Sequence, residues 1–322
     1  MTWSLSRPVL IACALSLAPA AQQGPVFRAG GDAVRVFVTV TDRDGRLVTS
    51  LAREDFELRD EGKPQPITVF DNTPRPIRLI VMLDVSGSME GNLPLLRAAA
   101  AQLFTRLLEG DLVKVGSFGR EIAISPTFTR DAEALAAALP GRIAPDSPTP
   151  LWHAILDAIK AFGERGDERR VVLVLSDGKD SGPTPFSRTF ASQVEVIDRA
   201  RDEDVMVYAV GMRSRGARRM PPGLGPGGLQ AALTADLPDA GLARVAEETG
   251  GGYAEIGFGQ DLGAAFARVA DELHSQYLLG FAPPKRDGKV HEIGIRVSKS
   301  GLKPRARKSY VASKGESASE RD

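Results

Sequence analysis

Residues 79–83, with the sequence Leu-Ile-Val-Met-Leu, form a continuous apolar run. Such a run is typical of a strand that is buried on both faces, as in a parallel sheet. A second run of this kind, Val171–Leu175, occurs later in the chain, and helical segments alternate with strands around both. The alternation predicts an α/β fold with a doubly wound, mostly parallel sheet and helices on both faces.

The pattern places this α/β domain at residues 76–275. The predicted helices are Leu93–Leu108, Ala132–Leu139, Leu151–Phe162, Phe190–Asp202, Leu242–Glu248 and Asp261–Ser275. The remaining predicted strands are Val113–Phe118, Val205–Val210 and Tyr253–Ile256. An insert at residues 212–238 is rich in Arg, Pro and Gly. Its composition favours a flexible, solvated linker. The other interpretation is a loop that steers an acidic partner.

β-strand patterns flank this domain on both sides. They are Val34–Thr41, Phe56–Arg59 and Ile67–Asp71 before it, and Gln276–Phe281, Val290–Ser298 and Arg305–Val311 after it. Either flank alone would be marginally stable, and the two ends of a domain often lie close together. We therefore expect residues 26–75 and 276–312 to pair into one small β-sandwich, with two separate β appendages as the alternative. The polar tail at 313–322 is expected to be disordered.

Residues 1–20 have the pattern of a secretory signal peptide. Arg7 supplies the positive charge, Val9–Leu17 the apolar segment and Ala18-Pro19-Ala20 the cleavage site. The one cysteine, Cys13, lies inside this segment, so the exported chain is expected to have no disulfide. Leu10–Cys13 also resembles a lipoprotein processing box, but the apolar stretch before it is short, which favours simple export to the periplasm or beyond.

Charge gives little support for a nucleic-acid or membrane partner. The 322 residues include 41 basic and 41 acidic side chains, so no strong net field draws the chain to an anionic polymer or lipid. No segment is long and apolar enough to predict a transmembrane helix. The local motifs therefore indicate the class of partner better than the net charge does. The sequence leaves the oligomeric state open.

Oxygen-bearing side chains gather where the two apolar runs end. Asp84-Val85-Ser86-Gly87-Ser88 follows the first run directly, and Asp177 follows the second. Thr149 lies in the loop before a predicted helix. Ligands of open α/β sheets bind at the carboxyl ends of the strands, and hard cations prefer oxygen ligands. Asp84, Ser86, Ser88, Thr149 and Asp177 are thus a candidate site for Mg²⁺, or for Mn²⁺ or Ca²⁺.

Other readings of these residues explain less of the pattern. Ser and Asp often cap helices after a strand, but capping alone does not account for Asp177 and Thr149 as well. A phosphatase of the haloacid dehalogenase type would need an acid at Ser86. The stretch also lacks the Gly-x-Ser-x-Gly elbow of a serine hydrolase and the Lys of a phosphate-binding loop. We therefore expect no enzymatic activity.

The set Asp84-x-Ser86-x-Ser88, Thr149 and Asp177 resembles the metal-ion-dependent adhesion site of von Willebrand factor A (VWFA) domains. The resemblance covers roughly residues 76–275. The flanking Glu54-Asp55-Phe56 and Gln276–Gly280 are similar to exported bacterial VWFA-related proteins. The resemblance to VWFA domains implies that Ser86, Ser88 and Thr149 are direct ligands. It also implies that the carboxylates of Asp84 and Asp177 act mainly through ordered water.

The resemblance also implies a function. A partner protein would supply an acidic side chain that completes the coordination of the cation, without a catalytic base. The alternatives are a structural envelope or assembly component with a stabilising metal and, third, a metal-dependent hydrolase. Two features depart from the family: Pro148 and Pro150 bracket Thr149 and stiffen its loop, and His153 stands where many relatives have an acid.

The remaining candidates favour structural roles. His153, His274 and His291 lack a spaced partner of the kind that metal sites use, so each is expected to be structural or solvent-facing. Trp152, beside His153, is expected to pack beneath the rim that carries the motif.

Overall fold

The computed structural model describes residues 33–314, except for positions 90, 145, 165, 167, 178–179, 182–190, 213–238 and 258–260. The predicted signal peptide, the insert beyond Met212 and the tail from 315 lie outside the described residues. Among the helices that are described, none is both long and apolar enough to cross a lipid bilayer.

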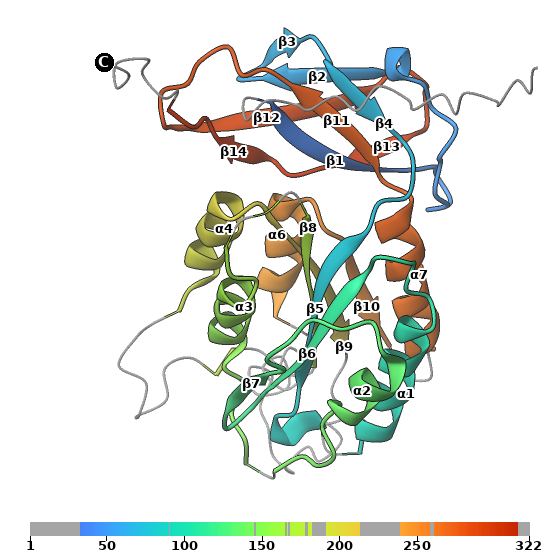
Figure 1. Ribbon diagram of the computed structural model, residues 1–322, viewed down its shortest axis with the longest axis vertical. Helices are drawn as coiled ribbons and strands as arrows, with labels where there is room; N and C mark the ends of the chain where they lie inside the picture. Colours follow the sequence, from blue (N-terminus) through green and yellow to red (C-terminus); the bar gives the residue numbers. More distant parts are fainter. Residues whose placement is uncertain are drawn as a thin grey trace, which may run out of the picture. The chain divides into compact units, whose positions relative to one another are not determined.

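The described part of the α/β region is built on one six-stranded sheet (Figure 1). In spatial order its strands are β10 (Tyr253–Ile256), β9 (Val205–Met212), β8 (Arg169–Ser176), β5 (Ile77–Asp84), β6 (Leu112–Phe118) and β7 (Ile122–Ile124). All neighbours are parallel except β6 and β7. The predicted fold class, a mostly parallel sheet in an α/β arrangement, is confirmed.

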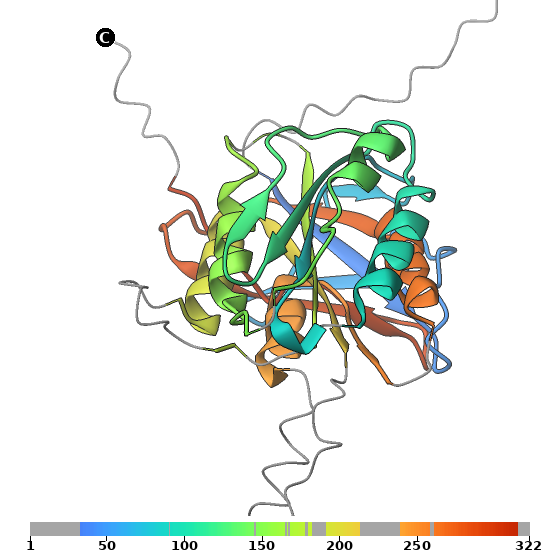
Figure 2. The same ribbon diagram turned by 90° about the horizontal axis from the view of Figure 1, so that it is seen from below.

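Helices cover both faces of this sheet, as the view turned by 90° also shows (Figure 2). On one face lie α1 (Leu93–Phe104), α2 (Ala132–Ala137) and α7 (Leu262–His274). On the other lie α3 (Leu151–Lys160), α4 (Gln193–Asp202) and α6 (Ala240–Thr249). Strand β5 contributes side chains to the apolar cores on both faces of the sheet, because its successive side chains point to opposite faces.

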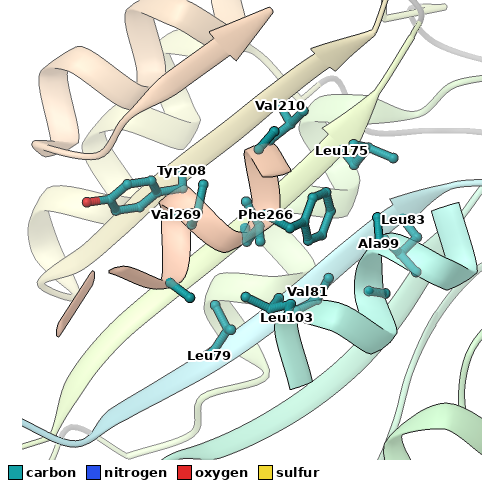
Figure 3. Packing of buried hydrophobic residues seen from close by; sticks show 14 of the residues in the cluster. Leu79, Val81, Leu83, Ala99, Leu103, Leu175, Tyr208, Val210, Phe266 and Val269 are labelled. Atoms are coloured by element: carbon teal, nitrogen blue, oxygen red, sulfur yellow. The ribbon is translucent and has the colours of Figure 1, made fainter. Parts of the chain in front are cut away.

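The alternation along β5 explains its unbroken apolar sequence. Leu79, Val81 and Leu83 pack in the layer that contains α1 and α7 (Figure 3). Ile80 and Met82 pack in the opposite layer, with α3. A polar residue in the middle of this strand would lie in one core or the other, so only the strand's end is free to carry polar groups.

Local sequence sets where several helices begin and end. The side chains of Asp131, Ser192, Asp239 and Asp261 accept hydrogen bonds from backbone N–H groups of the first turns of α2, α4, α6 and α7, respectively. Helix α6 ends at Gly250, whose φ of 83° suits a left-handed cap. Helix α1 ends four residues before the predicted Leu108, since residues 105–111 form turns.

Two further, antiparallel sheets each combine strands from both ends of the described chain (Figure 1). One has the order β13 (Lys303–Arg305), β1 (Val34–Thr41), β11 (Tyr277–Phe281) and β4 (Val69–Asp71). The other has the order β14 (Ser309–Val311), β12 (Val290–Val297), β2 (Phe56–Asp60) and β3 (Lys63–Gln65). Their inner side chains share one apolar core. The expected sandwich of N- and C-terminal segments is thus confirmed, while the domain boundaries stay a prediction.

One predicted strand is wrong as a single element. Residues 305–311 contain the end of β13 and all of β14, separated by residues 306–308. The two halves belong to different sheets, because β13 pairs with β1 and β14 pairs with β12. The short strands β3 and β7 were not predicted, since three residues are too few to show a period.

Asp111 joins three elements at the amino-terminal end of β5. Its carboxylate is fully buried, and it accepts hydrogen bonds from the backbone N–H groups of Ile77 at 3.0 Å and Leu108 at 2.7 Å. His274, at the end of α7, lies 2.9 Å from the same carboxylate. Burial alone would raise the pKa of Asp111, but these hydrogen bonds outweigh it and hold the pKa below its ordinary value.

Replacement of Asp111 is expected to destabilise the whole α/β region. Asp111→Ala leaves the buried N–H of Ile77 and the part-buried N–H of Leu108 without an acceptor, which costs about 2–4 kcal/mol in the free energy of unfolding. Asp131→Ala is the matched control, because it removes an exposed helix cap that contributes about 1 kcal/mol. Urea denaturation measures both changes. Equal losses for the two variants would contradict this account of Asp111.

The same carboxylate also makes stability depend on pH. The folded pKa of Asp111 is depressed, so its contribution is present above the unfolded pKa of about 4 and is lost as the pH falls through the folded value. The difference in unfolding free energy between wild type and Asp111→Ala should therefore shrink in acid.

Candidate metal centre

The candidate residues lie on loops at one end of the central sheet. Strand β5 ends at Asp84, and the chain continues into a 3₁₀ turn, η2 (Gly87–Met89). Strand β8 ends at Ser176, immediately before Asp177. Since β5 and β8 are adjacent and parallel, with Leu83 opposite Leu175, their carboxyl ends lie side by side. The topology brings the two carboxylates of the motif to one place.

The carboxylate of Asp84 is anchored inside the protein. It is fully buried, and its Oδ1 accepts a hydrogen bond from the backbone N–H of Ser86 at 2.8 Å. Its Oδ2 accepts one from the hydroxyl of Ser176 at 2.5 Å. Burial raises the pKa of Asp84, and these hydrogen bonds partly oppose the rise. Asp84 is thus oriented by its own loop and by the neighbouring strand.

A chain of hydroxyl contacts links the Asp84 loop to Asp177. The Oγ atoms of Ser86 and Ser88 are 3.1 Å apart, and Ser88 Oγ donates to Asp177 Oδ1 at 2.7 Å. Ser86 is buried, whereas Ser88 is exposed. Four of the predicted site residues, Asp84, Ser86, Ser88 and Asp177, are therefore brought together, and Ser88 is the member that faces solvent.

The second oxygen of Asp177 distinguishes this cluster from an ordinary loop. Asp177 is fully buried, and its Oδ2 has no hydrogen-bond partner among the described residues. Burial raises the pKa of Asp177 to about 6, and the nearby charge of Asp84 adds to the rise, while the hydrogen bond from Ser88 opposes it. A buried carboxylate oxygen without a partner is costly, and a bound cation would satisfy it.

Thr149 approaches the same cluster from the loop before α3. It is buried, and the carbonyl of nearby Ser147 accepts a hydrogen bond from the backbone N–H of Gly87 at 3.2 Å. This bond ties the loop of Thr149 to the loop of Ser86 and Ser88. The backbone N–H of Thr149 donates to Ser181 Oγ at 2.8 Å, so the residue is also held from the other side.

The residues fit a hard divalent cation. They offer two carboxylates and three hydroxyls, and Mg²⁺ accepts such oxygen ligands while keeping water in its remaining positions. Across the described residues, no cluster of three or more His, Cys, Asp or Glu side chains could hold a metal. The candidate centre differs from such clusters, because most of its candidate ligands are neutral hydroxyls.

Some residues of the centre were not predicted from sequence. Ser176 orients Asp84, and Ser147 joins two loops through its carbonyl while its Oγ accepts from the Arg120 N–H. Both stand beside motif residues, and adjacency is the one signal that could have indicated them. Ser181 gives no such signal, since it is 32 residues from Thr149.

Of the remaining candidates, two histidines and Trp152 behave as structural residues. His274 contacts Asp111, and His291 lies between Asp60 at 3.1 Å and Asp287 at 3.2 Å. Trp152 is buried in the layer that contains α3, as predicted.

The pKa of Asp177 leads to a prediction for the metal-free protein. Since the folded pKa is raised above the unfolded value of about 4, ionisation of Asp177 destabilises the fold as the pH rises through about 6. At pH 7.5 in EDTA, Asp177→Asn should therefore be more stable than wild type by about 2–3 kcal/mol. The gain should vanish near pH 4. Thermal unfolding at both pH values measures it, and a variant that is less stable at pH 7.5 would refute the buried, ionised carboxylate.

Comparison with known proteins bears on this geometry. The sequence profile of the von Willebrand factor type A domain matches residues 79–179, which include all five candidate residues. A comparison with curated proteins finds no match.

Solved structures give similarities of fold. BatB from Bacteroides thetaiotaomicron is 17% identical, with a TM-score of 0.45, over 61% of this chain and 97% of that one. A von Willebrand factor type A protein from Catenulispora acidiphila is 11% identical, with a TM-score of 0.46, over 88% and 75%. The vWF domain of the type V pili tip protein Mfa5 from Porphyromonas gingivalis is 12% identical, with a TM-score of 0.43, over 62% and 95%.

These TM-scores lie below 0.5, so the assignment rests on the sequence profile. The profile spans the strands, loops and helices that build the candidate centre. Residues 79–179 of this chain match the von Willebrand factor type A domain.

Proposed function

We propose that this chain is an exported protein-binding module that depends on a divalent metal ion. In this proposal an acidic side chain of a partner protein completes the coordination of the ion. The observation that carries it is the buried Oδ2 of Asp177, which has no hydrogen-bond partner among the described residues. The VWFA family assignment and the signal-like pattern at residues 1–20 support it.

Five residues would hold the cation. Ser86, Ser88 and Thr149 would contribute hydroxyl oxygens, and Asp84 and Asp177 would contribute negative charge, directly or through water. When bound, the ion supplies a positive, Lewis-acidic attachment point for an outside carboxylate. Asp84 is already committed to Ser86 and Ser176 through hydrogen bonds, so it is oriented before any ion arrives.

The charges and the exposure of the five residues favour a coordination shell that a partner protein completes. Two carboxylates balance a divalent cation in number, but both accept hydrogen bonds from serines, which withdraw part of their charge from the ion. Asp84, Ser86, Thr149 and Asp177 are buried, and Ser88 alone of the five is exposed. A partner carboxylate would therefore approach past Ser88.

The proposal requires no catalytic step. Binding of a carboxylate to a metal ion breaks no covalent bond and needs no general base. The partner would be a protein, and the natural ion would be Mg²⁺, with Mn²⁺ or Ca²⁺ as substitutes. A stabilising metal without a partner is the competing function, and metal-dependent stability together with metal-dependent peptide binding separates the two.

Magnesium is expected to stabilise the wild-type protein. At a free concentration 100 times the dissociation constant, a ligand of the folded state adds about 2.7 kcal/mol to the unfolding free energy. Ser88→Ala should lose most of this gain, and it should also lower the stability of the metal-free protein, because it removes the hydrogen bond to the buried Oδ1 of Asp177. Ser300→Ala, at an exposed turn, is the control. Calorimetric scans with Mg²⁺ and with EDTA measure the effect, and identical curves would exclude a metal site.

Selection from a random peptide library tests the partner. Peptides captured in Mg²⁺ and released by EDTA should contain an essential Asp or Glu. Replacement of that acid by its amide should reduce affinity at least tenfold, since a neutral amide binds the ion poorly. Peptides that bind equally well in EDTA, or after the amide replacement, would argue against metal-bridged recognition. Stabilisation by Mg²⁺ without such peptides would favour the structural role.

A further inference from the structure

The loop of Thr149 has very few backbone donors of its own. Pro148 and Pro150 carry no N–H, so Thr149 supplies the one backbone donor between them. That N–H donates to Ser181 Oγ at 2.8 Å, and the N–H of Ser181 returns a hydrogen bond to the Thr149 carbonyl at 3.0 Å. Two bonds in opposite directions fix the backbone of Thr149 against the segment that follows β8.

Asp180, the residue before Ser181, supports the first turn of the helix that follows the Thr149 loop. Helix α3 begins after Pro150, which provides no side-chain cap. Asp180 Oδ1 accepts a hydrogen bond from the N–H of Trp152 at 3.3 Å and so caps the helix from outside its own sequence. A carboxylate at this position also interacts favourably with the positive end of the helix dipole.

Asp180 is in turn anchored to α6. Its backbone N–H donates to Asp239 Oδ2 at 3.2 Å, while Asp239 Oδ1 accepts from the N–H of Gly241 at 2.8 Å. Gly241 also lies against the ring of Trp152, because a Cβ at position 241 would come within 2.8 Å of it. The beginnings of α3 and α6 are therefore packed together around residues 180–181.

We propose that Ser181 and Asp180, anchored by Asp239, are positioning residues that hold Thr149 ready for the metal ion. The inference rests on the proposed function. None of the three is assigned as a ligand. They act by fixing the backbone of Thr149 before the ion binds, so that binding does not have to order it. Release of one residue's backbone would weaken the binding of Mg²⁺ about tenfold.

Titration calorimetry with Mg²⁺ tests this role on the full chain. Ser181→Ala should raise the dissociation constant about tenfold, and Ser181→Thr, which keeps a hydroxyl, should restore most of the affinity. In a Thr149→Ala background, Ser181→Ala should have no further effect, because the residue it positions has lost its hydroxyl. Independent, multiplicative losses in that double-mutant cycle would overturn the proposal.

A pair of helix caps separates positioning from general stability. Asp239→Ala and Asp261→Ala each remove the side chain that caps a helix, α6 and α7 respectively. Both should lower the melting temperature, and Asp239→Ala should lower it more, because it also removes the hydrogen bond from the Asp180 N–H. Only Asp239→Ala should also weaken Mg²⁺ binding, because only Asp239 contacts Asp180. Equal metal affinities of the two variants would count against the anchor.

Hydrogen exchange in EDTA keeps this inference distinct from the proposed function. In the metal-free wild type the Thr149 amide should exchange slowly, and Ser181→Ala should accelerate it by at least tenfold while amides of β5 are unchanged. If the wild type binds no Mg²⁺, the proposed function fails and this measurement still reports on the hydrogen bonds. A Thr149 amide that exchanges fast in the wild type would refute the positioning itself.

Discussion

Two buried carboxylates at the ends of neighbouring parallel strands are the constraint on which this site depends. Asp84 and Asp177 are both fully buried, and burial raises the pKa of each. A pair of such groups is stable only when hydrogen bonds or a counter-charge compensate it. Ser86, Ser88 and Ser176 provide part of that compensation, and Oδ2 of Asp177, which has no partner within the described part of the chain, is the part that remains.

The layers of the fold explain why those carboxylates stand where they do. Strands β5 and β8 are enclosed by helices on both faces, so their interiors are apolar throughout. Polar side chains occur at the ends of these two strands, and parallel pairing brings their carboxyl ends together. The oxygen-rich rim is thus a consequence of burying the sheet on both sides, as is general for open α/β folds.

Much of this arrangement was predictable because its signals are local. The apolar runs at 79–83 and 171–175 indicated the central strands, and the residues directly after them indicated most of the candidate site. Prediction failed where an element is short or where its partner lies elsewhere in the chain. Strand β7 has three residues and no readable period, and residues 305–311 divide because their two halves pair with strands of different sheets.

By itself, the sequence determined which side chains are available at the rim and in what order, because strand ends and oxygen-bearing residues are adjacent in the chain. The tertiary structure alone decided how those side chains are held. Hydrogen bonds join Ser176 to Asp84, Ser88 to Asp177 and Ser181 to Thr149. The paired residues are 92, 89 and 32 positions apart in the sequence, respectively. Such pairings follow from strand order and loop packing, and no local propensity specifies them.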